Sequence, residues 1–411
     1  MIGNFRTIGN IIMFIPDNNI KNMIKLIKSS FYNEKKTKKE LCNFIINTKQ
    51  LSFGKYCKQF EKDFANWQGA KYCVFFNSGS SANLAIIQAL LNLGKIKKGD
   101  KIGFSSLTWA TNVMPIIQLG LNPVPLDVNL YTLNVSVEKL KEIHEKNNLK
   151  ALFITNLLGL CDKIDEIKDY CDKNKIILLE DNCESMGTIY KGEKLGNYGE
   201  MSSFSTYVGH HMSTVEGGMI CTNNKEFYKM LVIVRAHGWD RNMEKNEQEK
   251  IRKENNIENN LHSSYAFYNL GYNFRPSEFN GFLGCTQIPY LDEIVELREK
   301  NFKTFVKLIN SNPNLENIEY KHIDLVSSFS IPIICKSKEI LNKYIKLFQE
   351  NNIEIRPIVG GDITNQIFWK NLYGNEFLNE NARYIHENGF YFGNSPEYTN
   401  KEINLLCSLL K

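Results

Sequence analysis

Two adjacent histidines, His210 and His211, occupy a turn between two strands that the sequence predicts. The apolar and hydroxyl-rich run 201–207 predicts the first strand, and the run 219–222 predicts the second, after the glycine pair Gly217-Gly218. Neighbouring side chains point in different directions, so at most one of the two rings faces a given site. An imidazole at such a turn is suited to moving protons near neutral pH. The alternative is a solvated loop with two polar aromatic side chains.

A second candidate is a run of small residues, Asn77-Ser78-Gly79-Ser80-Ser81, between the apolar strand Tyr72–Phe76 and the helical run 82–93. Free backbone N–H groups and serine hydroxyls meet at the start of that helix, where the helix dipole is positive. This arrangement is suited to binding a phosphate group. A capping turn without any ligand explains the same residues.

Two further candidates directly follow predicted strands. Asp181 ends the apolar run KIILLED, where it either caps the next helix or holds a cationic ring nitrogen. Trp109 in LTWAT is either a core aromatic residue or a ring that stacks on a flat cofactor.

The elements that must position these residues alternate between strand and helix over some 150 residues. Such alternation predicts an α/β fold with a mainly parallel sheet that is covered on both faces. Ligands of such sheets lie beyond the carboxyl ends of the strands, where Ser80, Trp109, Asp181 and His210 are all expected. The predicted elements are Lys101–Ser105, Met114–Gln118, 123–126, 137–144, Ala151–Thr155, 164–173 and 176–180.

Outside this region the sequence predicts a large domain over 51–297 and a small α+β domain over 298–411. Residues 1–16 read as an extension, and two helices within 17–50 are expected to pack with the small domain. Helices are also predicted over 277–297 and 301–309, and the charged run 243–260 is predicted to be a surface excursion.

Composition excludes several classes of protein. With 411 residues, 43% hydrophobic and 23% charged, the chain is typical of a globular enzyme. A net charge of +5, dispersed along the chain, does not indicate nucleic-acid binding. The apolar run 11–16 is too short for a signal peptide or a membrane span. The ten scattered cysteines contain no C-x-C or C-x-x-C pair, which favours free thiols in the cytoplasm and no metal site.

Five motifs in order resemble the sugar aminotransferase family of fold type I, whose members use pyridoxal phosphate and act on nucleotide-linked ketosugars. They are NSGSSANL, LTWAT, LLEDNCESMG, FSTYVGHHMSTVEGG and LGYNFRP. The resemblance implies a seven-stranded sheet and a homodimer with shared active sites. It also implies that Asp181 pairs with the pyridine nitrogen, Trp109 stacks on the ring and Glu184 lies near the ring hydroxyl. Phosphate would be held by Gly79, Ser80 and Ser205, and by Asn273 of the neighbouring subunit.

The chain departs from the family at one position, because His210 stands where a lysine normally bonds covalently to the cofactor. This departure resembles a dehydratase branch of the family, which removes the C3 hydroxyl of GDP-linked 4-keto-6-deoxy sugars. His210 would then remove a proton at the cofactor carbon C4′ and return a proton to the departing hydroxyl. L-Glutamate would regenerate the pyridoxamine form of the cofactor, and ammonia would be released. His211 is expected to be structural.

Other functions remain open at this point. A related class of dehydratase uses an iron–sulfur cluster, which requires a cysteine cluster that this sequence lacks. A true aminotransferase would need another lysine in the site, such as Lys194 or Lys225, and an inactive scaffold on the same fold would need none. The nucleotide base and the choice between hexose and heptose are not determined by the residues.

Overall fold

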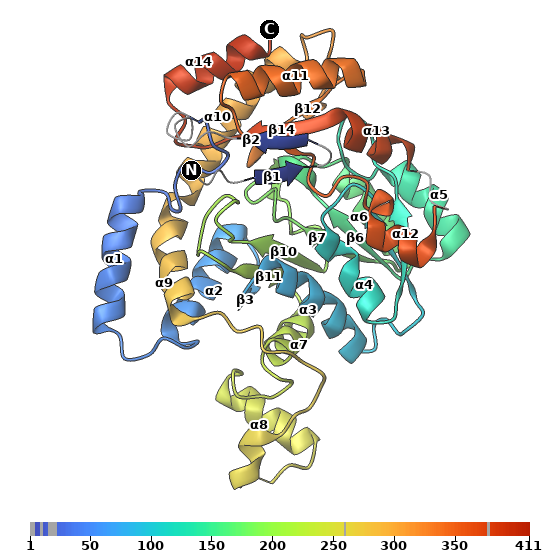
Figure 1. Ribbon diagram of the computed structural model, residues 1–411. Helices are drawn as coiled ribbons and strands as arrows, with labels where there is room; N and C mark the ends of the chain where they lie inside the picture. Colours follow the sequence, from blue (N-terminus) through green and yellow to red (C-terminus); the bar gives the residue numbers. More distant parts are fainter. Residues whose placement is uncertain (1–4, 9–10, 15–22, 259, 376–378) are drawn as a thin grey trace.

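The computed structural model describes residues 5–8, 11–14, 23–258, 260–375 and 379–411. Its centre is a seven-stranded sheet in which five adjacent strands are parallel and β11 runs antiparallel to both of its neighbours (Figure 1). The mainly parallel sheet is therefore confirmed. In spatial order the strands are β3 (Tyr72–Phe76), β11 (Gly218–Thr222), β10 (Met201–Ser205), β7 (Ile177–Asp181), β6 (Ala151–Thr155), β4 (Lys101–Ser105) and β5 (Asn122–Leu126).

Helices cover both faces of this sheet, and successive strand residues point to opposite faces. Each strand therefore contributes side chains to both hydrophobic layers. Phe76, Phe104 and Leu179 belong to the cluster that includes side chains of α3 and α7. Phe75 and Phe204 point to the other face, where they pack with residues of α2. The covering helices are α2 (Lys55–Gln68), α3 (Gly79–Asn92), α4 (Met114–Gln118), α5 (Val137–Asn147), α6 (Ile164–Asn174) and α7 (Lys225–Arg235).

The two carboxylates at the end of β7 point to opposite faces of the sheet, because successive side chains of a strand alternate. Asp181 shares the face of Leu179, toward α3, whereas Glu180 shares the face of Leu178. Glu180 is fully buried and accepts hydrogen bonds from the backbone N–H groups of Gly196, Tyr198 and Gly199. Glu180 therefore holds the loop that leads into β10, and Asp181 is left at the edge of the sheet.

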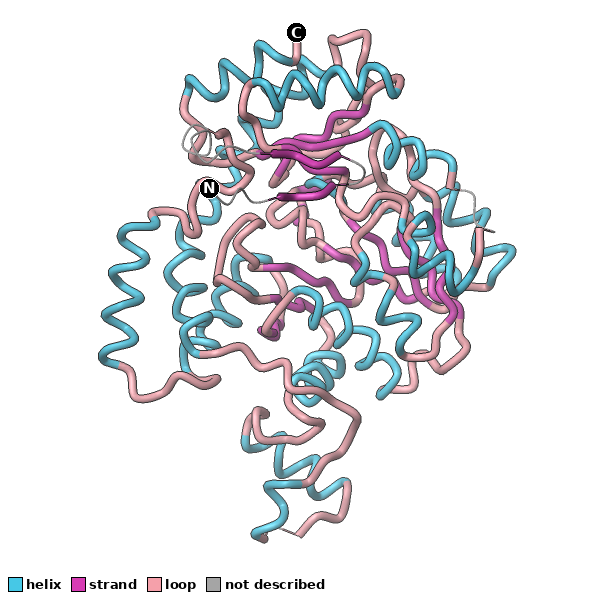
Figure 2. The backbone as a smooth tube through the Cα atoms, viewed as in Figure 1, coloured by secondary structure: helices cyan, strands magenta, loops and turns pink. Residues whose placement is uncertain are grey.

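A second, antiparallel sheet of three strands lies near the C-terminus, in the upper part of Figure 2, within the region predicted to be a small α+β domain. Its central strand is β14 (Gly389–Gly393), flanked by β12 (Ser330–Ile334) and β13 (Ile355–Pro357). Helices α11 (Lys338–Glu350), α13 (Glu380–Asn388) and α14 (Asn400–Leu409) share a hydrophobic cluster with this sheet. α12 (Ile367–Tyr373) packs instead on the large sheet, where the ring of Trp369 lies 5.6 Å from that of Phe104.

The helices expected over 277–297 and 301–309 have different bounds in the structure. The first run is divided into α9 (Glu278–Gln287) and the start of α10 by a short 3-10 turn, Ile288–Tyr290, which contains Pro289. Proline lacks the N–H group that a continuous helix needs at this place. α10 (Leu291–Ile309) then continues without a break across residue 297, where the sequence placed a domain boundary.

The expectation of two helices within 17–50 is wrong for the described residues. α1 (Glu34–Asn47) is a helix, but it packs on α9 and not on the small domain, with the rings of Phe44 and Phe282 stacked 4.4 Å apart. Residues 23–33 contain no helix, and residues 17–22 lie outside the described part of the chain. Two short strands, β1 (Phe5–Ile8) and β2 (Ile11–Phe14), pair as an antiparallel hairpin within the expected extension.

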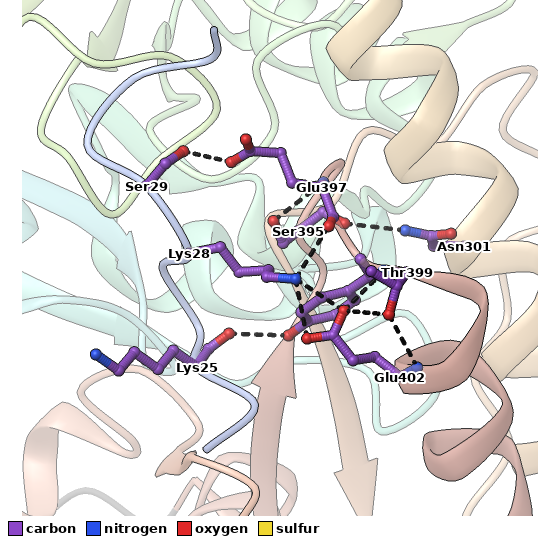
Figure 3. A network of polar contacts seen from close by, with 9 residues as sticks. Lys25, Lys28, Ser29, Asn301, Ser395, Glu397, Thr399 and Glu402 are labelled. Atoms are coloured by element: carbon purple, nitrogen blue, oxygen red, sulfur yellow. Dashed lines mark hydrogen bonds and ion pairs between the residues drawn. The ribbon is translucent and has the colours of Figure 1, made fainter. Parts of the chain in front are cut away.

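Residues 23–32, here called the strap, lie against the small domain instead of forming a helix. The backbone of Ile24 pairs with the chain at Ile353. Lys28 forms an ion pair of 2.8 Å with Glu402 at the start of α14, and Ser29 hydrogen bonds to Glu397 (Figure 3). These contacts with residues distant in sequence outweigh the local helical pattern of the apolar residues.

The charged run 243–260 is ordered around a helix, α8 (Lys245–Glu254), which projects from the lower side of the molecule in Figure 1. None of its residues is buried, as expected of a surface excursion. Arg252 pairs with the buried Asp240 at 2.8 Å and so fastens the helix to the preceding loop. No helix in the described ranges has both the length and the apolar composition that a membrane span requires.

Candidate active site

Asp181 is fixed at the carboxyl edge of the sheet by two carboxamides. Its Oδ2 accepts hydrogen bonds from Asn83 Nδ2 at 2.9 Å and from Asn112 Nδ2 at 2.8 Å. Its Oδ1 accepts the backbone N–H of Cys183 at 2.9 Å. Asn83 lies on α3 and Asn112 in the loop after β4, so three elements hold one carboxylate in a single orientation.

The ring of His210 is oriented by the turn that follows Asp181. Its Nδ1 lies 2.6 Å from the carbonyl oxygen of Cys183. Because a carbonyl oxygen only accepts hydrogen bonds, Nδ1 carries the hydrogen, and the lone pair of the neutral ring is on Nε2. The ring centroid of Phe329, from the small domain, lies 5.4 Å away. His210 is thus placed between the sheet edge and the small domain with its basic nitrogen available.

Burial lowers the pKa of His210 below its ordinary value, although the Cys183 hydrogen bond and the charge of Asp181 act in the opposite direction. The imidazole is therefore neutral at physiological pH. A neutral imidazole with a free Nε2 is the form that can act as a general base.

His211 points away from this site, as alternation at the turn predicts. It is buried, and its Nε2 lies 3.0 Å from the carbonyl oxygen of Ser327 in the segment before β12. Burial lowers its pKa well below the ordinary value. The hydrogen bond of His211 to Ser327 therefore joins the turn to the small domain.

The expected phosphate residues Gly79 and Ser205 lie against each other. A Cβ atom added to Gly79 would be 2.9 Å from Cβ and 3.3 Å from Oγ of Ser205, so the glycine permits this close approach. Ser78 caps the helix, accepting the N–H of Ser81 at 3.1 Å. Ser80 is exposed in the first turn of α3, where N–H groups have no partner within the helix.

Trp109 and Glu184 border the same edge of the sheet. Trp109 immediately precedes the 3-10 turn Ala110–Asn112, whose last residue binds Asp181, and it is 55% exposed. Glu184 is buried and accepts the backbone N–H of Leu158 at 3.0 Å. Burial, with a smaller contribution from Asp181, raises the pKa of Glu184 to about 8. Glu184 is therefore largely protonated at neutral pH.

This shift predicts a pH dependence of folding stability. Between the ordinary pKa of glutamate and about 8, the folded protein holds a proton at Glu184 that the unfolded chain has released. Stability contributed by this group therefore falls as pH rises through that window. We expect Glu184→Gln to reduce the fall in the free energy of unfolding between about pH 5 and about pH 8 by about 1–3 kcal/mol. Urea unfolding of both cofactor-free proteins at several pH values measures this free energy. If it fell equally with pH in the wild type and in Glu184→Gln, the prediction would be contradicted.

Asn273 is the one predicted site residue that the structure does not place with the others at the carboxyl edge of the sheet. It is exposed, and its Oδ1 accepts a hydrogen bond of 3.0 Å from Arg275. The backbone beside it does reach the site region, since Asn77 N–H donates to the carbonyl of Phe274 at 2.9 Å.

The two lysines considered as replacements for the missing one are held elsewhere. Lys194 donates to the carbonyl oxygen of Trp67, and its Nζ lies 3.8 Å from the centre of that ring. Lys225 is exposed on α7 and pairs with Glu247 at 2.9 Å. Neither contact involves Asp181 or His210, so these lysines do not complete an aminotransferase site in the described structure.

Sequence reasoning missed the carboxamides of Asn83 and Asn112. Asn83 had one visible signal, because it is the polar residue between Ala82 and the apolar run Leu84–Ile87 of α3. Asn112 had none, since a loop asparagine is ordinary. Neither signal indicates that both side chains converge on Asp181.

The fold and this arrangement define the class of protein. The chain belongs to the DegT/DnrJ/EryC1/StrS aminotransferase family, whose model matches residues 32–411.

Among its relatives, the chain is similar to the GDP-4-keto-6-deoxy-D-mannose 3-dehydratase of Escherichia coli O55:H7, with 35% identity over 372 residues, 89% of this chain and 95% of that protein. The protein of the same name from Yersinia pseudotuberculosis is 36% identical over 374 residues, 89% of this chain and 93% of that protein. A crystal structure of GDP-4-keto-6-deoxymannose-3-dehydratase with a trapped PLP-glutamate geminal diamine superposes with a TM-score of 0.85. It is 32% identical, with 94% of this chain and 100% of that chain covered.

Proposed function

We infer that this protein is a pyridoxal phosphate-dependent 3-dehydratase of a GDP-linked 4-keto-6-deoxy sugar. The observation that carries the proposal is the His210 ring, which stands beside Asp181 with Nε2 available where the family pattern has a covalently bonding lysine. The similarity to two 3-dehydratases over about nine-tenths of the chain supports the same reaction.

The residues present fit the cofactor by the chemistry of their donors. The carboxylate of Asp181, held by Asn83 and Asn112, would pair with the cationic ring nitrogen. Ser205 and the start of α3 offer hydroxyl and N–H donors for the phosphate. The largely exposed ring of Trp109 is free to stack on the pyridine, and the protonated Glu184 can donate to the ring hydroxyl. When bound, the cofactor supplies an electron sink that makes the neighbouring carbon acidic.

His210 would perform both proton transfers. Its Nε2 would take a proton from the cofactor carbon C4′, and the imidazolium would then donate a proton to the C3 hydroxyl, which leaves as water. The Nδ1–H hydrogen bond to Cys183 keeps the ring orientation constant during both steps. One residue suffices because the base of the first step becomes the acid of the second.

The overall reaction needs a two-electron reductant, since a C–OH group becomes C–H. We propose L-glutamate in this role. Its oxidation to 2-oxoglutarate consumes a water and supplies the nitrogen that leaves as ammonia, so the water lost from the sugar balances the one consumed. The products are then the 3-deoxy-4-ketosugar, 2-oxoglutarate and ammonia in equal amounts. Such a product would serve dideoxysugar synthesis for a surface polysaccharide, and the ten free thiols, most of them buried, favour a cytoplasmic location.

Trapping the cofactor tests the role of His210 against an aminotransferase. Borohydride reduction makes a lysine-bound cofactor permanent, so intact mass spectrometry of the reduced protein would then show added mass. We expect no added mass for this chain. A covalent adduct on any lysine would contradict the proposal.

We also propose that the enzyme is a homodimer in which Asn273 serves the partner's site. The segment that precedes Asn273 carries exposed apolar side chains, including Leu261 at 84% and Leu270 at 74%, which a second copy would cover. Asn273→Ala should weaken cofactor binding about 10-fold or more, because a hydrogen bond to a charged phosphate is lost.

Subunit mixing gives the sharper test of sharing. In a hybrid of an Asn273→Ala and a His210→Asn subunit, one site carries both defects and the other carries neither. At a cofactor concentration too low to load the Asn273→Ala protein, mixing the two variants should therefore restore activity that neither has alone. If the mixture shows only the summed activity of its parts, Asn273 acts in its own subunit or not at all.

A further inference from the structure

Arg298 is a buried cation without a counter-ion at bonding distance. It lies in the middle of α10 and is 6% exposed. Among the residues that the structure describes, no carboxylate comes within ion-pair distance of its guanidinium. Burying an unpaired charge is costly, so such a group is more often retained for function than for stability.

The guanidinium binds backbone carbonyls from both domains. Nη2 donates to the carbonyl oxygen of His210 at 3.4 Å, and Nη1 donates to those of Phe329 at 3.2 Å and of Asn394. Asn394 returns the contact, since its Nδ2 donates to the carbonyl oxygen of Arg298 at 2.9 Å. A planar fork of several donors is suited to joining acceptors in fixed directions.

These contacts fix the position of the proposed base, His210, relative to the aromatic residue Phe329. Phe329 precedes β12, and its ring lies 5.4 Å from the ring of His210. The same side chain therefore holds the backbone of His210 and the backbone of the aromatic residue that packs on it. Loss of Arg298 would free the His210 turn from the small domain on this side.

The charge of Arg298 also acts on His210. Asp181 at the end of β7 favours protonation of the ring, and Arg298 on α10 opposes it. The other ionisable groups around the turn are Glu184, Tyr207 and His211, and Lys28 and Glu397 line the small cavity between the turn and the strap. Burial lowers the pKa of Arg298 to about 10, so it stays charged at neutral pH. Within the described part of the chain, Arg298 is the cation that bonds directly to the His210 turn.

We propose that Arg298 is a positioning residue for the dehydration. It fixes the His210 turn against Phe329, and its positive charge adds to the effect of burial in disfavouring protonation of the imidazole. The proposal rests on the proposed function, in which His210 is the base.

The test compares Arg298→Met, which removes the charge and the donors, with Arg298→Lys, which retains only the charge. The titration of His210 is followed by NMR in the cofactor-loaded protein with ¹³C-labelled histidine, and the signal is assigned by its absence in His210→Asn. Turnover is measured over the same pH range. Arg235→Met is the matched control, because Arg235 is also buried but binds Glu61 and the carbonyl of Phe75.

We expect Arg298→Met to move the His210 titration and the acidic limb of the kcat profile to higher pH, because a positive charge is lost. Its kcat should fall by about 10²-fold through misplacement of the base. Arg298→Lys should keep the titration and still lose kcat, whereas Arg235→Met should leave the titration unchanged.

An unchanged titration and acidic limb in Arg298→Met would overturn the proposal, even if its thermal stability falls. If Arg298→Met does not fold, Arg298→Lys tests the proposal alone. A wild-type kcat of Arg298→Lys at all pH values would then contradict the positioning role of Arg298. The NMR titration requires no turnover. A failure of the proposed dehydration is therefore distinguishable from a failure of this inference.

Discussion

Replacing His210 by asparagine should lower kcat for removal of the C3 hydroxyl by at least about 10³-fold, because one imidazole serves as base and as acid. Asparagine can still donate a hydrogen bond toward the carbonyl of Cys183, so the turn should keep its shape. Measuring the deoxysugar by mass spectrometry over time gives the rate. Cofactor absorbance and thermal unfolding should remain close to those of the wild type, and more than a tenth of the wild-type rate would contradict the assignment.

His210→Lys is the informative companion variant. A lysine there should bond covalently to the cofactor and become trappable by borohydride, while dehydration is lost. Full dehydratase turnover in His210→Lys would show that the imidazole is not required.

The second large effect is expected for Asp181→Asn. Its new amide would place a donor against the carboxamide donors of Asn83 and Asn112, and the ring nitrogen would lose its anionic partner. We expect kcat to fall by about 10³-fold or more and the cofactor to dissociate more readily. Fluorescence titration of the cofactor and steady-state turnover measure the two effects separately.

Glu180→Gln is the matched control for Asp181→Asn. Glu180 is the adjacent buried carboxylate, but it faces the opposite side of β7 and binds backbone N–H groups of the loop before β10. This variant should be less stable, yet its folded fraction should bind the cofactor with wild-type affinity. Equal loss of cofactor affinity in both variants would mean that Asp181 has no specific part in holding it.

The strand and helix alternation could be predicted because it is a local pattern. Lys101–Ser105, Met114–Gln118 and Ala151–Thr155 have the predicted bounds, since each is a short apolar run between turn residues. The edge of the sheet follows from parallel pairing, which is why Asp181 and His210 could be placed near each other before any coordinates.

What could not be predicted depends on contacts between distant residues. Ile24 belongs to a helical pattern in the sequence, but pairing with Ile353 makes its segment a strap. The carboxamides of Asn83 and Asn112 converge on Asp181 only when α3 and the loop after β4 are both in place. Arg298 is one of four basic residues in the long amphipathic helix α10. Such residues normally face solvent, and only the folded chain shows Arg298 buried against the His210 turn.

The most direct test of the central claim is to incubate the protein with GDP-4-keto-6-deoxymannose, pyridoxal phosphate and L-glutamate and to quantify all products. We expect a nucleotide sugar that has lost the C3 hydroxyl and contains no added nitrogen, with ammonia and 2-oxoglutarate formed in equal amounts. A nucleotide-linked aminosugar formed in step with 2-oxoglutarate, without ammonia, would contradict it.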